Sequence, residues 1–438
     1  MKIDESVDNI NRKALEKEIS LLMQKLYPIC RSITGNGFRE TVRILQEYIS
    51  LSVHEIPTGT KVFDWEVPKE WNIRDAYIKN SKGVKIVDFK ENNLHVMSYS
   101  VPVRAKMSLE ELQKNLFTLP DYPDWIPYKT SYYNETWGFC ISYNQFKSLT
   151  DDIYDVCIDS TIENGCLTYG EYYCKGETSD EILISCHACH PSLCNDNVSG
   201  LSLVALLGKI LQSVSLRYSY RIIIIPGTIG SITWLAKNQL SLARIKHGLV
   251  VNNVGDNGEL TYKRSRIGDA EIDKVTEHVL RNSGLSFNIV DFSPYGYDER
   301  QYCSPGINLP VGSLQRTPHG QYPEYHTSAD NLDFVLPENV FDSLLQYLNV
   351  CKILENNKRY INEKPYCEPQ LGSRGLYDTS AAPSSVVVDK MALLWVLNLS
   401  DGTHSLLDIS ERSGIKFDLI KTASDALMQK ELLSEYID

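Results

Sequence analysis

The chain has 438 residues, of which 42% are hydrophobic, so it can bury a large core and is long enough for two or three domains. Its formal net charge of -12 argues against a nucleic-acid or anionic-membrane partner, because both bind basic surfaces. The first residues lack the basic and apolar regions of a signal peptide, and no apolar run is long enough to span a bilayer. We therefore expect a soluble, cytoplasmic protein.

The amino-terminal third changes character near residue 55. Apolar side chains at helical spacing predict a helix over residues 8–26 and a second over residues 38–49. From residue 56 to residue 155, short alternating runs, four Trp residues and frequent Pro and Gly indicate a compact β-rich unit. Residues 108–116 are its one clear helical stretch.

Residues 156–364 alternate between apolar strands and helices. The strands are predicted at residues 182–186, 221–226, 249–251 and 307–314, and helices at residues 199–214, from 231 onward and at 338–355. Continuous apolar strands that alternate with helices are typical of a largely parallel sheet covered on both faces. We therefore predict an α/β fold with a three-layer, mostly parallel sheet.

A linker containing Pro, Gly and Ser, residues 365–385, precedes a last unit of residues 386–438. Helices are predicted at residues 389–399, 406–413 and 417–430, and this spacing resembles a winged helix. From Lys390 to Asp438 there are five Lys or Arg against eight Asp or Glu, a net charge of -3. A DNA-binding unit relies on cations that neutralise phosphates, so we expect this unit to bind a protein or to dimerise.

Metal-binding residue types concentrate in the segment CHACHPSLCNDNVSG, residues 186–200. It follows the first predicted buried strand, and open α/β sheets place their sites at the carboxyl ends of strands. His187 and Asp196 offer the imidazole and carboxylate that suit zinc and leave positions open for water. The alternative is a turn that caps a helix, with a histidine satisfied in a loop.

A second polar loop, PEYHTSADN at residues 323–331, supplies another histidine before a helix. Taken singly, His326 is more often structural. Distant loops at the same end of one sheet can converge, however, so we expect His326 to join His187 and Asp196.

These residues resemble the co-catalytic zinc aminopeptidase superfamily, which includes bacterial leucyl aminopeptidases and, more distantly, single-zinc glutaminyl cyclases. His187 matches its first histidine, Asp196 its bridging aspartate and His326 its late histidine. Tyr-Asp-Glu at residues 297–299 and Gly-Ile-Asn-Leu-Pro at residues 306–310 match the superfamily's Ser-Asp-His and Gly-Ile-Pro segments.

A closer resemblance is to a bacterial aminopeptidase-like family with an inserted β domain and a C-terminal winged helix. It rests on DWEVPKEWNI at residues 64–73, CHPS at 189–192 and DERQYCSPG at 298–306. The resemblance implies that residues 1–55 and 156–364 form one discontinuous domain, with residues 56–155 inserted. Members are often found near polysaccharide-biosynthesis functions, which indicates a pathway by association only.

Three departures from the superfamily pattern bear on activity. Gly227-Thr228 stand where the aminopeptidases carry Glu-Glu, so the general base and one zinc ligand are missing from their expected place. Cys189 replaces the Asp that orients the first histidine. The strand that should end in a ligand Asp reads VNNVGD, which makes Asp256 a candidate and Asn253 its rival.

We therefore predict one zinc ion held by His187, Asp196 and His326, with Asp256 as a weaker candidate and a second ion doubtful. Cys189 and His190 are expected to be neighbours that shape the pocket. A zinc knuckle of Cys186, Cys189 and Cys194 lacks a second Cys pair, and a nucleophilic Cys189 or Cys303 conflicts with the usual inertness of cysteines near buried strands.

Hydrolysis at such a site needs a carboxylate that takes a proton from water. Glu299 and Glu324 are the available replacements for the missing base. The candidates for substrate binding are Asp298, Arg300 and Arg264. Each of the two arginines has a guanidinium, which can bind a substrate carboxylate through two hydrogen bonds. The alternative for these groups is a solvated, ion-paired loop.

The leading hypothesis is a zinc-dependent aminopeptidase-like hydrolase that acts on a small peptide or amide. A catalytically silent scaffold that binds a small molecule or a protein is the first alternative, which the missing Glu pair favours. A single-zinc acyl transferase of the glutaminyl cyclase type is the second. A homo-oligomer or a protein partner could form through the β-rich unit or the C-terminal unit.

Overall fold

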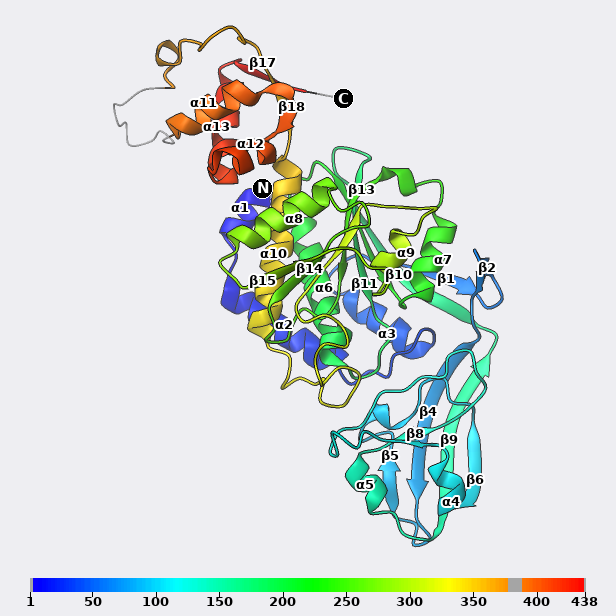
Figure 1. Cartoon of the computed structure of the whole chain (residues 1–438). Coiled ribbons are helices and arrows are strands. Elements are labelled where there is room, and N and C mark those ends of the chain that lie inside the picture. Colours follow the sequence, from blue (N-terminus) through cyan, green and yellow to red (C-terminus); the bar gives the residue numbers. More distant parts are fainter. Residues whose placement is uncertain (1–2, 377–387, 437–438) are drawn as a thin grey trace. The chain divides into compact units, whose positions relative to one another are not determined.

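The computed structural model describes residues 3–376 and 388–436 (Figure 1). The chain divides into two compact units, Met1–Leu348 and Asn349–Asp438. The predicted linker and the start and end of the predicted last unit lie partly outside the described residues. No helix among the described residues is long and apolar enough to cross a membrane. All eleven cysteines are free, as expected for reduced thiols.

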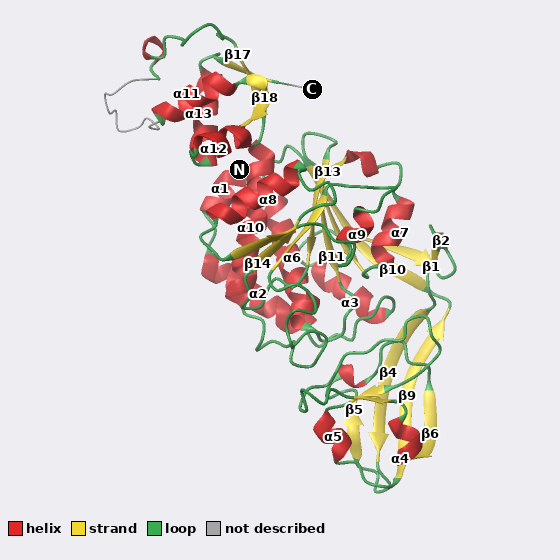
Figure 2. Ribbon diagram, viewed as in Figure 1, coloured by secondary structure: helices red, strands yellow, loops and turns green. Residues whose placement is uncertain are grey.

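An eight-stranded mixed sheet forms the centre of the first unit (Figure 2), with the strand order β1-β10-β12-β11-β13-β16-β14-β15. The four central strands are parallel: β12 (Ser219–Ile225), β11 (Glu181–His187), β13 (Ile245–Val251) and β16 (Val311–Gln315). The outer strands are β1 (Ser52–Pro57), β10 (Cys166–Cys174), β14 (Leu260–Lys263) and β15 (Phe287–Val290).

The apolar runs predicted the four central strands, because these strands are buried on both faces. The outer strands carry more polar residues and were not predicted. β10 pairs antiparallel with β1 and β12, and β14 pairs antiparallel with β16, whereas β15 at the edge is parallel to β14. The expectation of a mostly parallel sheet therefore holds for the four central strands but not for the outer strands. The sheet as a whole is mixed.

Helices of the first unit flank this sheet (Figure 2). They are α1 (Ile3–Asp8), α2 (Arg12–Leu26), α3 (Asn36–Leu45), α6 (Gly200–Leu211), α7 (Ile229–Lys237), α8 (Glu271–Asn282), α9 (Glu299–Tyr302) and the first part of α10 (Pro337–Asn356), with a 3-10 turn η3 (Leu242–Arg244). The side chain of Asn11 caps α2 by accepting from the N–H of Ala14. Almost all of α6 is buried, and α6 contacts β11 and β12.

The β-rich unit contains a second, four-stranded antiparallel sheet in the order β5-β4-β9-β6. Its strands are β4 (Glu70–Lys79), β5 (Lys85–Asp88), β6 (Val103–Ser108) and β9 (Ile153–Glu163); shorter pairs are β2 (Lys61–Val62) with β3 (Trp65–Glu66) and β7 (Leu116–Phe117) with β8 (Phe139–Cys140). Capping boxes at Ser108 and Ser142 begin the short helices α4 (Leu109–Gln113) and α5 (Tyr143–Lys147), and η1 (Asn93–His95) is a 3-10 turn. We call residues 56–155 the insert; β9 continues past its predicted end.

The second unit joins three helices to a small antiparallel sheet in the order β18-β17-β19. The elements are β17 (Arg359–Asn362), η4 (Gly372–Arg374), α11 (Lys390–Leu399), β18 (Asp401–Ser405), α12 (Leu406–Ser413), α13 (Phe417–Gln429) and β19 (Leu433–Glu435). The three helices lie where their apolar periodicity predicted them. Gly414 ends α12 in the left-handed conformation, with a φ of 69°.

Candidate metal centre

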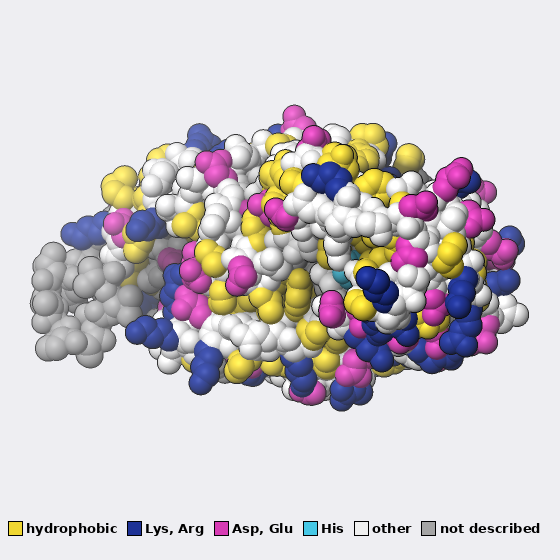
Figure 3. Space-filling view, turned by 90° about the horizontal axis from the view of Figure 1, so that it is seen from below, with side chains coloured by type: hydrophobic (Ala, Val, Ile, Leu, Met, Phe, Trp, Pro, Cys, Tyr) yellow, Lys and Arg dark blue, Asp and Glu magenta, His cyan; other side chains and the backbone are white. Residues whose placement is uncertain are grey.

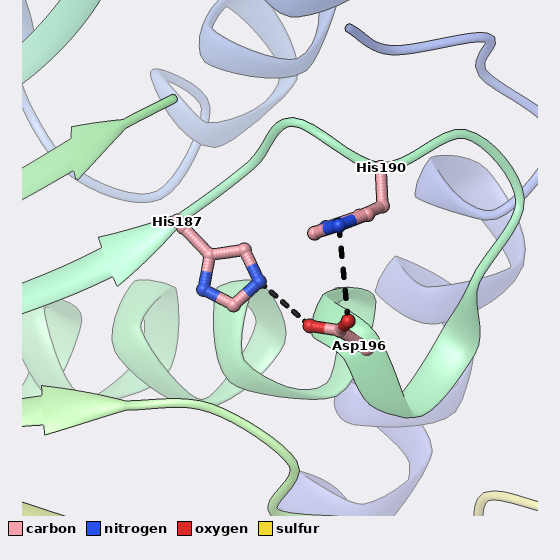
Figure 4. A group of neighbouring side chains, drawn as sticks. All are labelled: His187, His190 and Asp196. Carbon is pink, nitrogen blue, oxygen red and sulfur yellow. Dashed lines mark hydrogen bonds and ion pairs between the residues drawn. The ribbon is translucent and has the colours of Figure 1, made fainter. Parts of the chain in front are cut away.

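Three polar side chains meet directly after β11 (Figure 4). His187 is the last residue of β11, His190 follows three residues later, and Asp196 lies in the π-helical segment η2 (Cys194–Ser199) before α6. One ligand atom from each lies within 4.8 Å of the others, and all three residues are buried. Nε2 of His187 is 2.7 Å from Oδ1 of Asp196, and Nε2 of His190 is 3.9 Å from Oδ2 of Asp196.

His326 and Tyr297 reach the same carboxylate from two other loops. Nε2 of His326 lies 3.1 Å from Oδ2 of Asp196, and the hydroxyl of Tyr297 donates to that oxygen at 2.7 Å. The ring of Tyr297 also stacks on His187, with centroids 4.1 Å apart. We call His187, His190, Asp196 and His326 the cluster. The structure thus brings the three predicted ligands together and adds His190, which the sequence analysis had set aside.

The protonation states of His190 and Asp196 suit a metal ion. Burial lowers the pKa of His190 to about 3, although Asp196 opposes this shift, so the imidazole is neutral at pH 7. Burial favours a protonated Asp196, but His190 and His187 hold its pKa well below its usual range. Neutral imidazoles and an ionised carboxylate are the forms that bind zinc.

Asp330 fixes the segment that carries Asp196. Its carboxylate accepts hydrogen bonds from the backbone N–H groups of Asn195 at 2.5 Å and Asp196 at 3.1 Å, and its carbonyl accepts from the N–H of Cys194. Burial raises the pKa of Asp330 to about 8 despite these donors. Asp330 therefore acts on the cluster through the backbone, a role that the sequence analysis did not assign.

Asp256 also holds the segment that carries Asp196, through Asn195, and does not contact the cluster itself. Its carboxylate accepts from the side-chain amide of Asn195 at 2.9 Å, the N–H of Gly258 and the hydroxyl of Thr317 at 2.6 Å. Among the described residues, the group of His, Cys, Asp and Glu side chains with metal-ligand spacing does not include Asp256. Asp256, which was expected to be a weaker candidate metal ligand, therefore stabilises the segment that carries Asp196 through its contact with Asn195.

The position of Gly227 faces His187 and Asp298. A Cβ at residue 227 would lie 3.2 Å from both Oδ2 of Asp298 and Cβ of His187, so Asp298 and His187 border the space beside Gly227. Oδ1 of Asp298 accepts from the hydroxyl of Ser231 at 2.7 Å, while its buried Oδ2 has no partner among the described residues. Burial raises the pKa of Asp298 to about 6, and His187 opposes this shift.

Glu299 and Glu324, the two predicted bases, differ in their surroundings. Glu299 is buried and pairs with Lys263, whose Nζ lies 2.9 Å from Oε1. Glu324 is half-buried, and its carbonyl accepts from the N–H and the hydroxyl of Thr327. Among the described residues, neither carboxylate forms a hydrogen bond or an ion pair with a residue of the cluster.

The two predicted arginines also differ. Arg264 forms ion pairs with Glu277 at 2.6 Å and Asp291 at 2.5 Å, which matches the alternative of an ion-paired loop. Nε of Arg300 is buried and has no partner within residues 3–376 and 388–436. The substrate-binding role of Arg300 stays a prediction.

The cysteines of the first segment are poorly suited to a knuckle or a nucleophile. Cys186, Cys189 and Cys194 are buried, and burial raises the pKa of each thiol far above its ordinary value. A thiol in this state is a weak nucleophile and a weak ligand.

The insert contacts the loop that carries His326. The backbone N–H of Tyr128 donates to the carbonyl of His326 at 2.8 Å, and Ile126 and Ser328 exchange two further hydrogen bonds. The ring of Tyr128 lies edge-to-face against His190 and His326, with centroids 5.3 Å and 5.0 Å away. No sequence motif had indicated Tyr128; the high number of Tyr residues was the only hint.

Comparison with protein families covers almost the whole chain. Residues 20–357 match DUF4910, described as a domain of unknown function, and residues 358–435 match a winged helix-turn-helix family. The chain belongs to the DUF4910 family. A Clostridium acetobutylicum protein, named as a proposed polysaccharide biosynthesis protein with an aminopeptidase-like domain, is 55% identical over 416 residues, 95% of this chain and 96% of its own.

Solved structures place the DUF4910 region among the aminopeptidase folds. A crystal structure of a proposed peptidase from Clostridium acetobutylicum is 52% identical, covers 99% of both chains and has a TM-score of 0.94. A zinc aminopeptidase from Bacillus subtilis has a TM-score of 0.55 at 14% identity, over 78% of this chain and 94% of its own. A Shewanella amazonensis peptidase precursor has the same TM-score at 13% identity, over 81% and 98%. The predicted resemblance to the zinc aminopeptidase superfamily is confirmed, and so is the predicted winged helix at the C-terminus.

Proposed function

We propose that this DUF4910 protein is a zinc-dependent, aminopeptidase-like hydrolase of a small peptide or amide. The observation that carries the proposal is the convergence of three imidazoles on the buried carboxylate of Asp196. Nitrogen and oxygen donors fit one zinc ion, which His187, Asp196 and His326 would hold, with His190 beside them; three protein ligands would leave a position open for water. Zinc, when bound, supplies a Lewis acid that polarises a carbonyl and lowers the pKa of water.

Asp298 is the residue that we assign to proton transfer. Its Oδ2 is buried, lies beside the position of Gly227 and has no partner among the described side chains. Ser231 orients the carboxylate through Oδ1, so Oδ2 remains open to accept a proton from water and to return it to a leaving amine. This assignment replaces the missing Glu pair with a carboxylate from another loop.

Tyr297 has a positioning role in this proposal. Its hydroxyl donates to Asp196 and its ring stacks on His187, so one side chain holds a carboxylate and an imidazole in fixed orientation. The name of the 55% identical relative supports a substrate from a polysaccharide-related pathway.

Metal analysis of the full chain purified without added zinc tests the first half of the proposal. We expect about one equivalent of zinc per chain, because a buried site with histidine and carboxylate donors retains its ion through purification. Less than about a tenth of an equivalent, with no gain on incubation with zinc, would contradict the proposal.

Turnover of a panel of aminoacyl amides tests the second half. We expect Asp298→Asn to lower kcat by about a hundredfold or more while zinc content is unchanged, because an amide cannot accept the proton. Glu299→Gln and Glu324→Gln test the bases predicted from the sequence, and Asp159→Asn, an exposed carboxylate on β9 that pairs with Arg74, is the matched control. A wild-type chain that holds zinc and turns over no amide would instead favour the silent scaffold, which the Gly227-Thr228 pair supports.

A further inference from the structure

A polar pocket of about 540 Å³ lies beside the cluster, and Tyr297 and His319 line it. Both residues also belong to the surroundings of the cluster: their rings are in edge-to-face contact, with centroids 5.4 Å apart, and Tyr297 contacts Asp196. Figure 3 shows histidine side chains at the base of a hollow on this side of the molecule. The volume suits a small ligand rather than a few water molecules.

The floor of the pocket is one face of the neighbouring strands β14 and β16 of the large sheet. In the observed register Gln315 pairs with Thr261, and Ser313 pairs with Lys263, so these four side chains share a face. All four are buried. The opposite face of β14 carries Leu260 and Tyr262 and packs on α8, as a buried strand ordinarily does. A buried sheet face made of polar side chains is uncommon and needs hydrogen-bond partners.

Several of these polar groups lack partners. Oε1 of Gln315, Oε2 of Glu299 and Nδ1 of His319 are buried without a hydrogen bond to any described residue. Lys263, by contrast, has hydrogen-bond partners: its Nζ donates to Oε1 of Glu299 at 2.9 Å and to the carbonyl of Tyr295 at 2.7 Å. Buried acceptors without donors cost free energy, so the pocket is suited to a ligand that donates hydrogen bonds.

The chemistry of the floor selects among such ligands. The ion pair of Lys263 and Glu299 leaves no net charge on the floor itself, and the carboxylates of Glu259 and Asp291 also line the pocket, which disfavours an anionic ligand. The remaining side chains of the floor, Thr261, Ser313 and Gln315, each offer both donors and acceptors, which hydroxyl groups match and which an ammonium or a carboxylate alone does not. At the rim, Tyr295 is 73% exposed and presents an aromatic surface.

The geometry points to a binding pocket for a neutral, hydroxyl-rich group, the ring of a sugar, next to the cluster. The assignment of this sugar as a part of the substrate rests on the proposed function. Binding of the sugar in the pocket does not, because none of the pocket side chains named above is assigned to the metal. The pocket thus defines the substrate class as a carbohydrate that carries an amide or peptide bond.

Titration of the full chain, freed of metal with a chelator, tests the pocket by itself. The probes are the methyl glycosides of glucose and N-acetylglucosamine, with leucinamide as a probe that lacks sugar hydroxyls. We expect saturable binding of a glycoside with a Kd below about 10 mM and no comparable binding of leucinamide. Absence of glycoside binding up to about 50 mM, or preferential binding of leucinamide, would overturn the inference.

Two substitutions locate the bound sugar. Gln315→Met and Thr261→Val keep the side-chain size, remove polar atoms from the floor and are expected to weaken glycoside binding about tenfold each. Gln346→Met is the matched control, because Gln346 is also buried with an unpartnered Oε1 but lies on α10, away from the pocket lining. Equal binding by all three variants, each checked for an unchanged thermal transition, would overturn the location.

The two proposals fail separately. Glycoside binding in a chain that retains no zinc would leave the pocket standing and refute the hydrolase. Zinc retention and amide turnover without glycoside binding would support the hydrolase and refute the sugar-binding pocket.

Discussion

His187 and His326 reach the same carboxylate from supports of very different kinds. His187 ends a central strand between two parallel neighbours, is fully buried and lies against the ring of Tyr297. His326 lies in a loop, has a left-handed φ of 57° and exposes 31% of its side chain. The sheet therefore fixes one half of the cluster, whereas contacts with the insert hold the other.

This difference gives the insert a part in the site. Backbone hydrogen bonds join Tyr128 to His326 and Ile126 to Ser328, across about two hundred residues of sequence. An inserted unit attached only at its ends would leave the loop of His326 without these partners. The insert is thus expected to set the geometry of the exposed histidine while the buried histidine is independent of it.

The largest effect is expected at the carboxylate that both halves share. Asp196→Ala removes the group contacted by His187, His326 and Tyr297, so zinc affinity should fall by roughly a hundredfold or more. Zinc content and a competition titration with a chelating dye measure this change. Asp256→Asn, in the neighbouring support, should retain most of the zinc, and equal loss in both variants would refute the central position of Asp196.

A smaller effect is expected when the insert's contact is weakened. Tyr128→Ala removes the ring that packs against His190 and His326, and zinc affinity should fall about tenfold through looser positioning. Tyr128→Phe keeps the ring and should bind zinc within about twofold of the unchanged chain. Tyr133→Ala, an exposed tyrosine of the same insert, is the control. If Tyr128→Ala binds zinc normally, the ring of Tyr128 has no part in positioning the cluster.

A pH-dependent effect is expected where the insert joins the α/β domain. Arg39 of α3 forms two hydrogen bonds of 2.7 Å with Glu70 of β4 and lowers the pKa of Glu70 from 4.5 to about 2. A depressed carboxyl pKa stabilises the fold above pH 4.5, and this stability is lost as the pH falls towards 2. The free energy of unfolding should decrease by about 2 kcal/mol across that window.

Urea unfolding at pH 6 and pH 3 measures this loss. In the Glu70→Gln chain, the free energy of unfolding should differ less between the two pH values. Glu66→Gln removes an exposed pair with Lys61 and should change little. A Glu70→Gln chain with the same pH dependence as the unchanged chain would show that the Arg39 pair is not its source.

The smallest effect is expected in the second unit, which carries a winged helix but an excess of acidic residues. We expect no shift of a DNA duplex by the full chain at about 150 mM salt, because too few cations are available to neutralise phosphates. DNA binding that survives this salt concentration would contradict a protein-binding role for the unit.

The sequence by itself determined the central strands and most helices, and it predicted that His187, Asp196 and His326 lie together. Apolar runs and helical spacing are local signals, and the residues around Asp196 resemble a known motif closely enough to identify its partners. The polar outer strands gave no such signal, so the mixed character of the sheet was missed.

Only the tertiary structure decided which buried polar groups meet. Tyr128, Tyr297 and Asp330 reach the cluster from segments that are distant in the sequence, and His190 joined it because its loop bends back over Asp196. The polar pocket likewise depends on the register of β14 with β16. A sequence pattern records whether a residue is suited to burial, whereas its partner across the fold is set by packing, because contacts between distant segments leave no local periodicity.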